Sequence, residues 1–141
     1  AGPCHAPDGK KSRFENLIML GQLANAELAG WMSRATIFAL PARYEPFGLA
    51  ALEAGLAGCV LVLGDIPSQR EIWRDAALFV PPDEPDALSA TLLQVIGDER
   101  VRKVMSRRAR KRALAFPVER MAQGYMDLYR RMLAGAVEYA A

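Results

Sequence analysis

The chain has 141 residues, of which 52% are hydrophobic, 24% charged and 8% aromatic. This length predicts a single domain that can bury a core without disulfides or a structural metal, and the composition excludes a disordered chain or a membrane channel. No apolar run reaches the roughly 18 residues that span a bilayer, and no basic-then-apolar leader opens the sequence. We therefore expect a soluble, unsecreted protein.

The formal net charge of +2 is unevenly distributed along the chain. Residues 1–99 carry 7 Lys and Arg against 13 Asp and Glu, whereas residues 100–141 carry 11 against 3. A basic segment of this kind is found where a protein contacts nucleic acid or anionic lipid, and also on the solvated face of an ordinary helix. The charge balance alone leaves all three interpretations open.

Two cysteines and one histidine limit the redox and metal chemistry. Cys59 opens the apolar run 59–63, which predicts a buried, reduced thiol and favours the cytoplasm. Cys4 lies far from it, so the two form no CxxC pair. His5 is the one histidine and stands in the polar opening stretch, so neither a zinc site nor a Ser-His-Asp triad is expected.

Apolar runs and helical spacings alternate along the chain. Residues 1–13 are rich in Gly, Pro and charge, which predicts a loop or frayed terminus. The elements predicted after it are, in chain order, a strand at 17–20, a helix at 26–34, a strand at 36–40, a helix at 47–56, a strand at 59–63, a short helix from 68, a strand at 78–80, helices at 83–96 and 99–115 and, after a break at Phe116-Pro117, a helix at 118–133. Short strands that alternate with helices predict an α/β fold with a parallel sheet covered on both faces. The predicted domain covers residues 14–134, and 135–141 form a tail.

Local signals predict several helix ends. Asn25 and Asp98 are expected to cap the helices that follow them, because their side-chain oxygens can accept from the first backbone amides. Ser68 and Glu71 have the spacing of a capping box. Gly58 is expected to end the helix before it.

Large apolar residues predict the core. Trp31 and Met32 on the first helix, and Phe79 on a strand, are expected to be buried. Tyr125 and Tyr129 are four residues apart and share one face of the last predicted helix. We expect this face to pack back against the domain.

The segment 40–54 is the one that suggests chemistry. A buried strand leads into a loop and then a helix at the carboxyl edge of the sheet, where open α/β folds bind ligands. Pro46 disfavours helical geometry at Glu45, so the Glu45 carboxylate is expected to project from the loop. Gly48 is expected to present a bare backbone N–H at the helix start, which favours an anion. Glu53 lies just over a turn further along.

Such an arrangement suits a phosphorylated polyol. The backbone amides would hold the phosphate, and the two carboxylates would accept hydrogen bonds from hydroxyl groups. The opposing interpretation is that Glu45 and Glu53 are surface acids and that Gly48 belongs to an ordinary turn. The residues taken by themselves leave both interpretations open.

Two acids separated by seven residues, as in Glu45-Pro46-Phe47-Gly48-Leu49-Ala50-Ala51-Leu52-Glu53, resemble the E-x7-E motif of retaining glycosyltransferases with the GT-B architecture. The best match is the large family 4, the glycosyl transferases group 1. The resemblance covers roughly residues 17–133 and extends to the segments 20–28, 39–41, 53–63, 65–82 (a recurrent bacterial variant) and 116–129. Pro67-Ser68-Gln69 replaces a frequent Gly-Gly pair near the sugar. The resemblance implies the carboxyl-terminal, Rossmann-like half of a GT-B enzyme, incomplete at its amino-terminal side.

Roles for individual residues also come from the resemblance. It implies that Glu45 hydrogen-bonds hydroxyls of the donor sugar and that Glu53 hydrogen-bonds those of the ribose. The backbone amides of Phe47, Gly48 and Leu49 would meet the sugar and the diphosphate. These amides would stabilise the charge that develops on the leaving β-phosphate.

The nature of the donor follows from the same resemblance. The loop 21–25, with Gly21, Gln22 and Asn25, would lie along the base. The donor would be a nucleotide-diphosphate sugar, UDP- or GDP-linked, and the transfer of its hexose would retain the anomeric configuration. No cofactor and no metal are implied.

Enzymes of this kind also have an amino-terminal acceptor domain and a basic pair that grips the donor diphosphate, and this chain carries neither. We therefore expect it to need the acceptor domain, in cis or in trans, and to be inactive alone. In intact relatives the terminal helix can cross towards the acceptor domain, which would leave Tyr129 and Met132 exposed here. We expect a cytoplasmic protein, with a peripheral position at the inner face of the membrane as the alternative.

Two other function classes remain open. The basic helix 99–115 could bind an anionic membrane surface or nucleic acid, but no aromatic residue interleaves with its charges, so nucleic acid is not expected. A solvated helix on the flank of the domain explains the same charges. A catalytically silent interaction domain is the other alternative.

Overall fold

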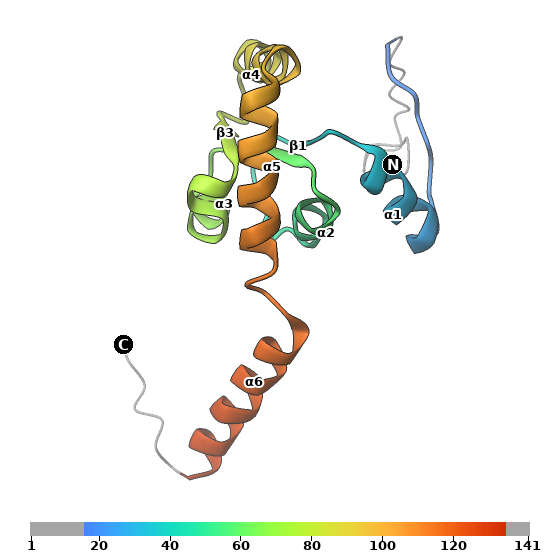
Figure 1. Ribbon diagram of the computed structural model, residues 1–141. Coiled ribbons are helices and arrows are strands. Elements are labelled where there is room, and N and C mark those ends of the chain that lie inside the picture. Colours follow the sequence, from blue (N-terminus) through green and yellow to red (C-terminus); the bar gives the residue numbers. More distant parts are fainter. Residues whose placement is uncertain (1–15, 135–141) are drawn as a thin grey trace, which may run out of the picture.

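The computed structural model describes residues 16–134 of the chain (Figure 1). The predicted opening loop 1–13, with Cys4 and His5, and the predicted tail 135–141 lie outside these residues.

A parallel sheet of three strands lies at the centre, in the order β1 (Ile37–Leu40), β2 (Val60–Gly64) and β3 (Leu78–Val80). Ile37 is paired with Val60 in the first ladder, and Val62 with Leu78 in the second. Because β2 has a neighbour on each side, all five of its residues are buried. The α/β class and the parallel sheet expected from the sequence are confirmed.

Helices connect and flank these strands. They are α1 (Asn25–Arg34), α2 (Leu49–Ala57), α3 (Pro67–Trp73) continued by the 3-10 turn η1 (Arg74–Ala76), α4 (Pro85–Gly97), α5 (Glu99–Ala113) and α6 (Val118–Leu133). Both α2 and α5 pack against β2, and α1 packs on α2. Each helix predicted from the sequence is present.

The strand expected at 17–20 is wrong, because these residues form no ladder with any described strand. Leu17 is 60% exposed and Ile18 85% exposed. A strand is stable only with a neighbour that satisfies its backbone groups, and β1 pairs with β2 alone. An apolar run thus predicted the residue types of a strand but not the presence of a partner.

Small residues let α2 lie close to its neighbours. Ala51, Ala54 and Gly55 are buried on it. A Cβ added at Gly55 would lie 3.2 Å from the ring of Trp73 and 3.3 Å from the Cβ of Ala113. The larger part of the core therefore consists of β2, the inner face of α2, Trp73 and the alanines of α5, and a second cluster contains Val60, Val95 and Met105.

Cys59 is buried, as the sequence predicts. Its thiol donates to the carbonyls of Met32, at 3.3 Å, and Ala35, at 3.4 Å. Burial raises the pKa of the Cys59 thiol, so the protonated form is favoured. These contacts tie the start of β2 to the end of α1.

The predicted caps have mixed outcomes. Asp98 caps α5 as expected, accepting from the amides of Arg100 and Val101 at 2.8 and 3.0 Å. Asn25 does not cap α1: it is the first helical residue, and the Glu27 carboxylate accepts from the preceding amide of Ala24 at 3.0 Å.

The capping box predicted at Ser68 is also wrong. The N-cap of α3 is Ile66, and Pro67 takes the first helical position, where its missing N–H costs nothing. The Ser68 hydroxyl is therefore not used at the end of its own helix. It donates to a distant loop, described below.

The core predictions on α1 and β3 are partly confirmed. Met32 is buried and Phe79 is half-buried against the core. Trp31 is 43% exposed instead, and the Arg34 guanidinium lies 5.1 Å from the centre of its ring. Only one of the two neighbouring positions of α1 can face α2, on which this helix packs.

Several arginines of α5 are engaged by the domain itself. Arg102 donates to the carbonyls of Val95 and Ile96 at the end of α4, and Arg112 donates to the carbonyl of Ile72. These contacts favour the solvated flank among the interpretations of the basic helix. None of the helices within 16–134 has the length and apolar character needed to cross a bilayer.

The last helix, α6, is set apart from the rest of the molecule (Figure 1). None of its 16 residues, all of them described, is buried. Tyr125 and Tyr129 are each 55% exposed, so they do not pack back on the domain as expected. The exposure inferred for Tyr129 and Met132 from intact relatives is the arrangement observed.

Candidate functional site

The candidate site is the turn between β1 and α2. β1 delivers the chain to the carboxyl edge of the sheet at Leu40, and the loop 41–48 leads into α2. Gly48 is the N-cap of α2, with φ 83° and ψ 61°. This left-handed conformation is the physical reason for a glycine at this place.

The side-chain carboxylate and the backbone carbonyl of Glu45 are both hydrogen-bonded. Its carboxylate oxygen Oε1 accepts from the backbone N–H of Gly48 at 2.9 Å. Its backbone carbonyl accepts from the Ser68 hydroxyl at 2.7 Å and from Nε2 of Gln69 at 3.3 Å. The carboxylate therefore folds back onto the turn and does not project from it, and the Gly48 amide is not bare.

The backbone N–H groups that remain open for a ligand lie just after Gly48. No described residue accepts from the amides of Leu49, Ala50 or Ala51, whereas the amide of Leu52 already donates to Gly48 within the helix. The first turn of α2 contains no acidic residue. These amides and the positive end of the helix dipole favour an anion, which the Glu45 carboxylate flanks.

Glu53 lies on the side of α2 that faces α1. It lines a cavity of about 370 Å³ together with Asn25, Leu28, Met32 and other residues of these two helices. The structure thus brings Glu53 and Asn25 to one cavity, but Glu45 is not among the residues that line it. Gly21 has φ 65°, and Gln22 is exposed, with no described contact that fixes it to this cavity.

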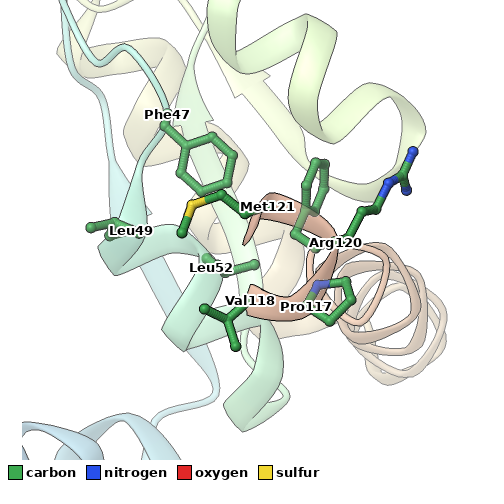
Figure 2. A pocket seen from close by; sticks show the side chains of 8 residues that line it. Phe47, Leu49, Leu52, Pro117, Val118, Arg120 and Met121 are labelled. Carbon is green, nitrogen blue, oxygen red and sulfur yellow. The ribbon is translucent and has the colours of Figure 1, made fainter. Parts of the chain in front are cut away.

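An apolar cavity of about 590 Å³ adjoins the same turn (Figure 2). It lies between the start of α2 and the start of α6, and its lining includes Phe47, Leu49, Phe116 and Met121. The rings of Phe47 and Phe116 meet edge to face, with their centres 5.6 Å apart. Phe47 therefore anchors the turn to the α5–α6 junction.

An ion pair stands at the carboxyl end of β2. The Arg70 guanidinium donates to both carboxylate oxygens of Asp65 and lies 4.8 Å from the centre of the Phe79 ring. These hydrogen bonds hold the pKa of Asp65 below its usual range. Among residues 16–134, no group of three or more His, Cys, Asp or Glu is placed to hold a metal ion.

The sequence model of a protein family, the glycosyl transferases group 1, matches residues 11–112 of the chain. The chain belongs to this family. Its relatives include the O-antigen chain mannosyltransferase B of Escherichia coli (32% identical over 79% of this chain) and a D-inositol 3-phosphate glycosyltransferase of Jonesia denitrificans (30% over 77%). A glycogen synthase of Mycobacterium tuberculosis is 36% identical over 66% of the chain.

The fold of this group 1 chain is also that of a known glycosyltransferase. The sucrose-phosphate synthase of Thermosynechococcus elongatus superposes with a TM-score of 0.75 and 28% identity, over 82% of this chain and 30% of its own. The sheet and its helices are therefore a Rossmann-like part of a GT-B architecture. The chain spans only 29% of the mannosyltransferase, 26% of the inositol phosphate enzyme and 23% of the glycogen synthase.

Sequence reasoning missed two residues of this group 1 site. Ser68 and Gln69 reach the Glu45 carbonyl across 23 and 24 positions of the chain. The Ser68 pattern has a plausible local use, in a capping box, and nothing local indicates a distant carbonyl. Only the packing of α3 beside the β1–α2 turn reveals the contact.

Proposed function

We propose that this group 1 domain binds the nucleotide-diphosphate sugar donor of a glycosyl transfer at the start of α2. The observation that carries the proposal is the group of open amides at Leu49, Ala50 and Ala51 beside a fixed Glu45 carboxylate. Phosphate oxygens can accept hydrogen bonds from these amides, and sugar hydroxyls can donate hydrogen bonds to the carboxylate. Membership of the family supports the same reading.

The two acids would take different parts of the donor. Oε1 of Glu45 is occupied by the Gly48 amide, and no described group donates to Oε2, which leaves this oxygen for a sugar hydroxyl. Glu53 shares its cavity with Asn25, so it would meet the ribose while the loop 21–25 follows the base. Phe47 and Leu49 would frame the sugar and diphosphate from the other side.

Binding at this place would aid the chemistry directly. As the nucleoside diphosphate departs, negative charge grows on its β-phosphate, and amides already oriented towards it stabilise that charge without reorganising. The proposal includes a UDP- or GDP-linked hexose, retention at the anomeric carbon and no metal or other cofactor. A nucleotide-sugar donor suits a cytoplasmic location.

We infer that the acceptor is bound by residues outside this chain. The relatives' names mention an O-antigen chain, an inositol phosphate and glycogen, which are different molecules. This chain spans less than a third of each of these three relatives. We therefore propose that transfer needs an acceptor domain in cis or in trans.

Calorimetric titration tests donor binding. UDP, GDP and ADP, and then UDP-glucose and GDP-mannose, are titrated into the protein up to millimolar concentration. At least one should bind, and Glu53→Ala should weaken it about tenfold, because a hydrogen bond from a ribose hydroxyl to a charged group is lost. Glu119→Ala, an exposed acid at the start of α6, is the matched control and should bind like the wild type. No heat with any of these ligands, on a sample shown to be folded, would refute the proposal.

A further inference from the structure

The backbone carbonyl of Glu45 has two side-chain donors on one helix. The Ser68 hydroxyl lies 2.7 Å from it and Nε2 of Gln69 lies 3.3 Å from it. Both donors come from the start of α3, which follows a different strand. Two consecutive residues thus converge on a single atom of the candidate site.

Gln69 is the buried polar residue of the described core. Its side chain is 1% exposed, and its Oε1 has no hydrogen-bond partner in the described structure. An unpaired buried amide oxygen lowers stability, and an aliphatic side chain of similar size would avoid that cost. The bond that the amide does make is the one from Nε2 to the Glu45 carbonyl.

The same amide lies directly under Gly48. A Cβ built on Gly48 would stand 3.2 Å from Nε2 of Gln69 and 3.5 Å from its Oε1. The glycine therefore serves a second purpose besides its positive φ, because it leaves space for the amide beneath the turn. Gln69 therefore lies against both Glu45 and Gly48, the residues at the two ends of the turn.

We propose that Ser68 and Gln69 are positioning residues for the donor site. With its carbonyl held from α3, Glu45 can keep its carboxylate on the Gly48 amide. This keeps Oε2 of Glu45 beside the open amides at the start of α2. The inference rests on the proposed function for the identity of the ligand, but the positioning itself is a property of the free protein.

The test follows the Gly48 amide by NMR in the free protein and measures the donor affinity separately. The variants are Ser68→Ala and Gln69→Leu, with Ser68→Thr to restore the hydroxyl. Each deletion should speed hydrogen exchange at the Gly48 amide about fivefold or more and raise the dissociation constant of the bound nucleotide sugar by a similar factor, since one hydrogen bond is lost from the turn. Ser68→Thr should return both values close to the wild type.

Ser106→Ala is the matched control. The Ser106 hydroxyl donates to the carbonyl of Gly58 at 2.8 Å, so it also joins a distant helix to a turn, but at the far end of α2. It should lower global stability about as much as Ser68→Ala and leave the Gly48 amide and the donor affinity unchanged.

The outcomes separate the two proposals. If Gly48 exchanges at the same rate in wild type, Ser68→Ala and Gln69→Leu, or if Ser106→Ala speeds it equally, the positioning role is refuted. If the wild type binds no nucleotide sugar, the proposed function fails, and the Gly48 measurement still decides whether the two residues hold the turn. If the deletions loosen Gly48 but leave the dissociation constant unchanged, the residues do not position the site for a donor.

Discussion

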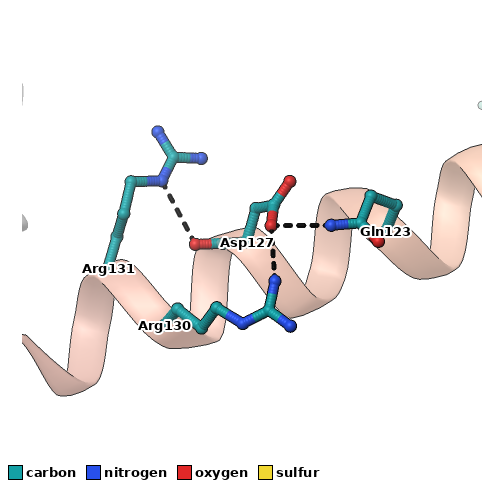
Figure 3. Close-up of polar contacts among 4 residues, drawn as sticks. All are labelled: Gln123, Asp127, Arg130 and Arg131. Atoms are coloured by element: carbon teal, nitrogen blue, oxygen red, sulfur yellow. Dashed lines mark hydrogen bonds and ion pairs between the residues drawn. The ribbon is translucent and has the colours of Figure 1, made fainter.

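The turn at the start of α2 and the helix α6 are built in opposite ways. Around Gly48, residues from α2, α3 and the loop after β1 fix one another, and Gln69 is 1% exposed beneath them. In α6 the polar contacts are local in sequence: Asp127 accepts from Gln123 at 2.8 Å and from Arg130 at 2.9 Å (Figure 3), and Arg120 donates to the carbonyl of Ala115, just before the helix. The turn is held by distant parts of the fold, and α6 by its own and adjoining residues.

This difference shows what a helical pattern can and cannot specify. The helical spacing of the apolar residues in 118–133 predicts a helix with the bounds that α6 has. Its apolar face, which includes Met121, Tyr125 and Tyr129, is nevertheless exposed. In contrast, the inner face of α2 is made of small residues and is buried because its neighbours approach closely.

Two glycine substitutions, one in the sheet and one in α6, should differ most in their effect on stability. In Gly64→Ala the new Cβ would lie 2.3 Å from the carbonyl oxygen of Ala42, a backbone atom that cannot turn aside. We expect a loss of about 3 kcal/mol or more in the free energy of unfolding, measured in urea, or failure to fold. Gly124→Ala in α6 meets no described atom within 4 Å. It should raise helicity in circular dichroism by removing a helix-interior glycine, and any comparable destabilisation would contradict the comparison.

A methionine pair tests burial. Met105, on α5, is 8% exposed, whereas Met126, on α6, is 49% exposed. Met105→Ala should lower the free energy of unfolding by about 2–3 kcal/mol, because it leaves a cavity in the core. Met126→Ala should change it by less than about 0.5 kcal/mol. Equal losses in urea denaturation would mean that α6 is part of the same cooperative unit.

Two left-handed glycines sharpen the description of the site itself. Gly48→Ala places a Cβ 3.2 Å from Gln69 in a backbone that L residues rarely adopt. We expect it to cost about 2 kcal/mol in stability and to weaken donor binding. Gly58→Ala has a similar φ of 92°, but its nearest neighbour, the Ser106 hydroxyl, is 3.9 Å away. It should cost about 1 kcal/mol and leave donor binding, measured by calorimetry, unchanged.

The smallest effect concerns pH. Arg70 lowers the pKa of Asp65 in the folded protein, so the pair contributes stability above the unfolded pKa of about 3.9. This contribution should fade as the pH falls through the folded pKa. The urea midpoint of the wild type should therefore exceed that of Asp65→Asn near pH 6, and the difference should shrink in acid. Arg70→Gln should remove the same pH dependence, and an unchanged difference at all pH values would argue against the pair.

The parts of the fold that the sequence predicts correctly are those with local signals. Asp98 caps α5 and Gly58 ends α2 as expected, and Pro117 precedes α6, because each residue acts on the backbone within one turn of itself. Two other local signals, the cap at Asn25 and the capping box at Ser68, are not used. The remaining failure concerns a contact with a distant segment. The strand expected at 17–20 lacks a neighbouring strand among the described residues.

The candidate site divides in the same way. The spacing of Glu45 and Glu53 around Gly48, with the segments that surround it, predicted the family that the comparisons show. It could not predict that the Glu45 carboxylate accepts from the Gly48 amide, or that the open donors begin one residue later. A side-chain direction depends on what else occupies the space around it.

By itself, the sequence determined the alternation of short strands and helices, the ends of most helices and the family to which the chain belongs, because these depend on residue types at short separations. The tertiary structure alone decided which apolar faces are covered and how the turn at Gly48 is held. Ser68 and Gln69 act on Glu45 across more than twenty residues, and no periodicity or local motif encodes such a distance. The packing of α3 beside α2 is what brings them together.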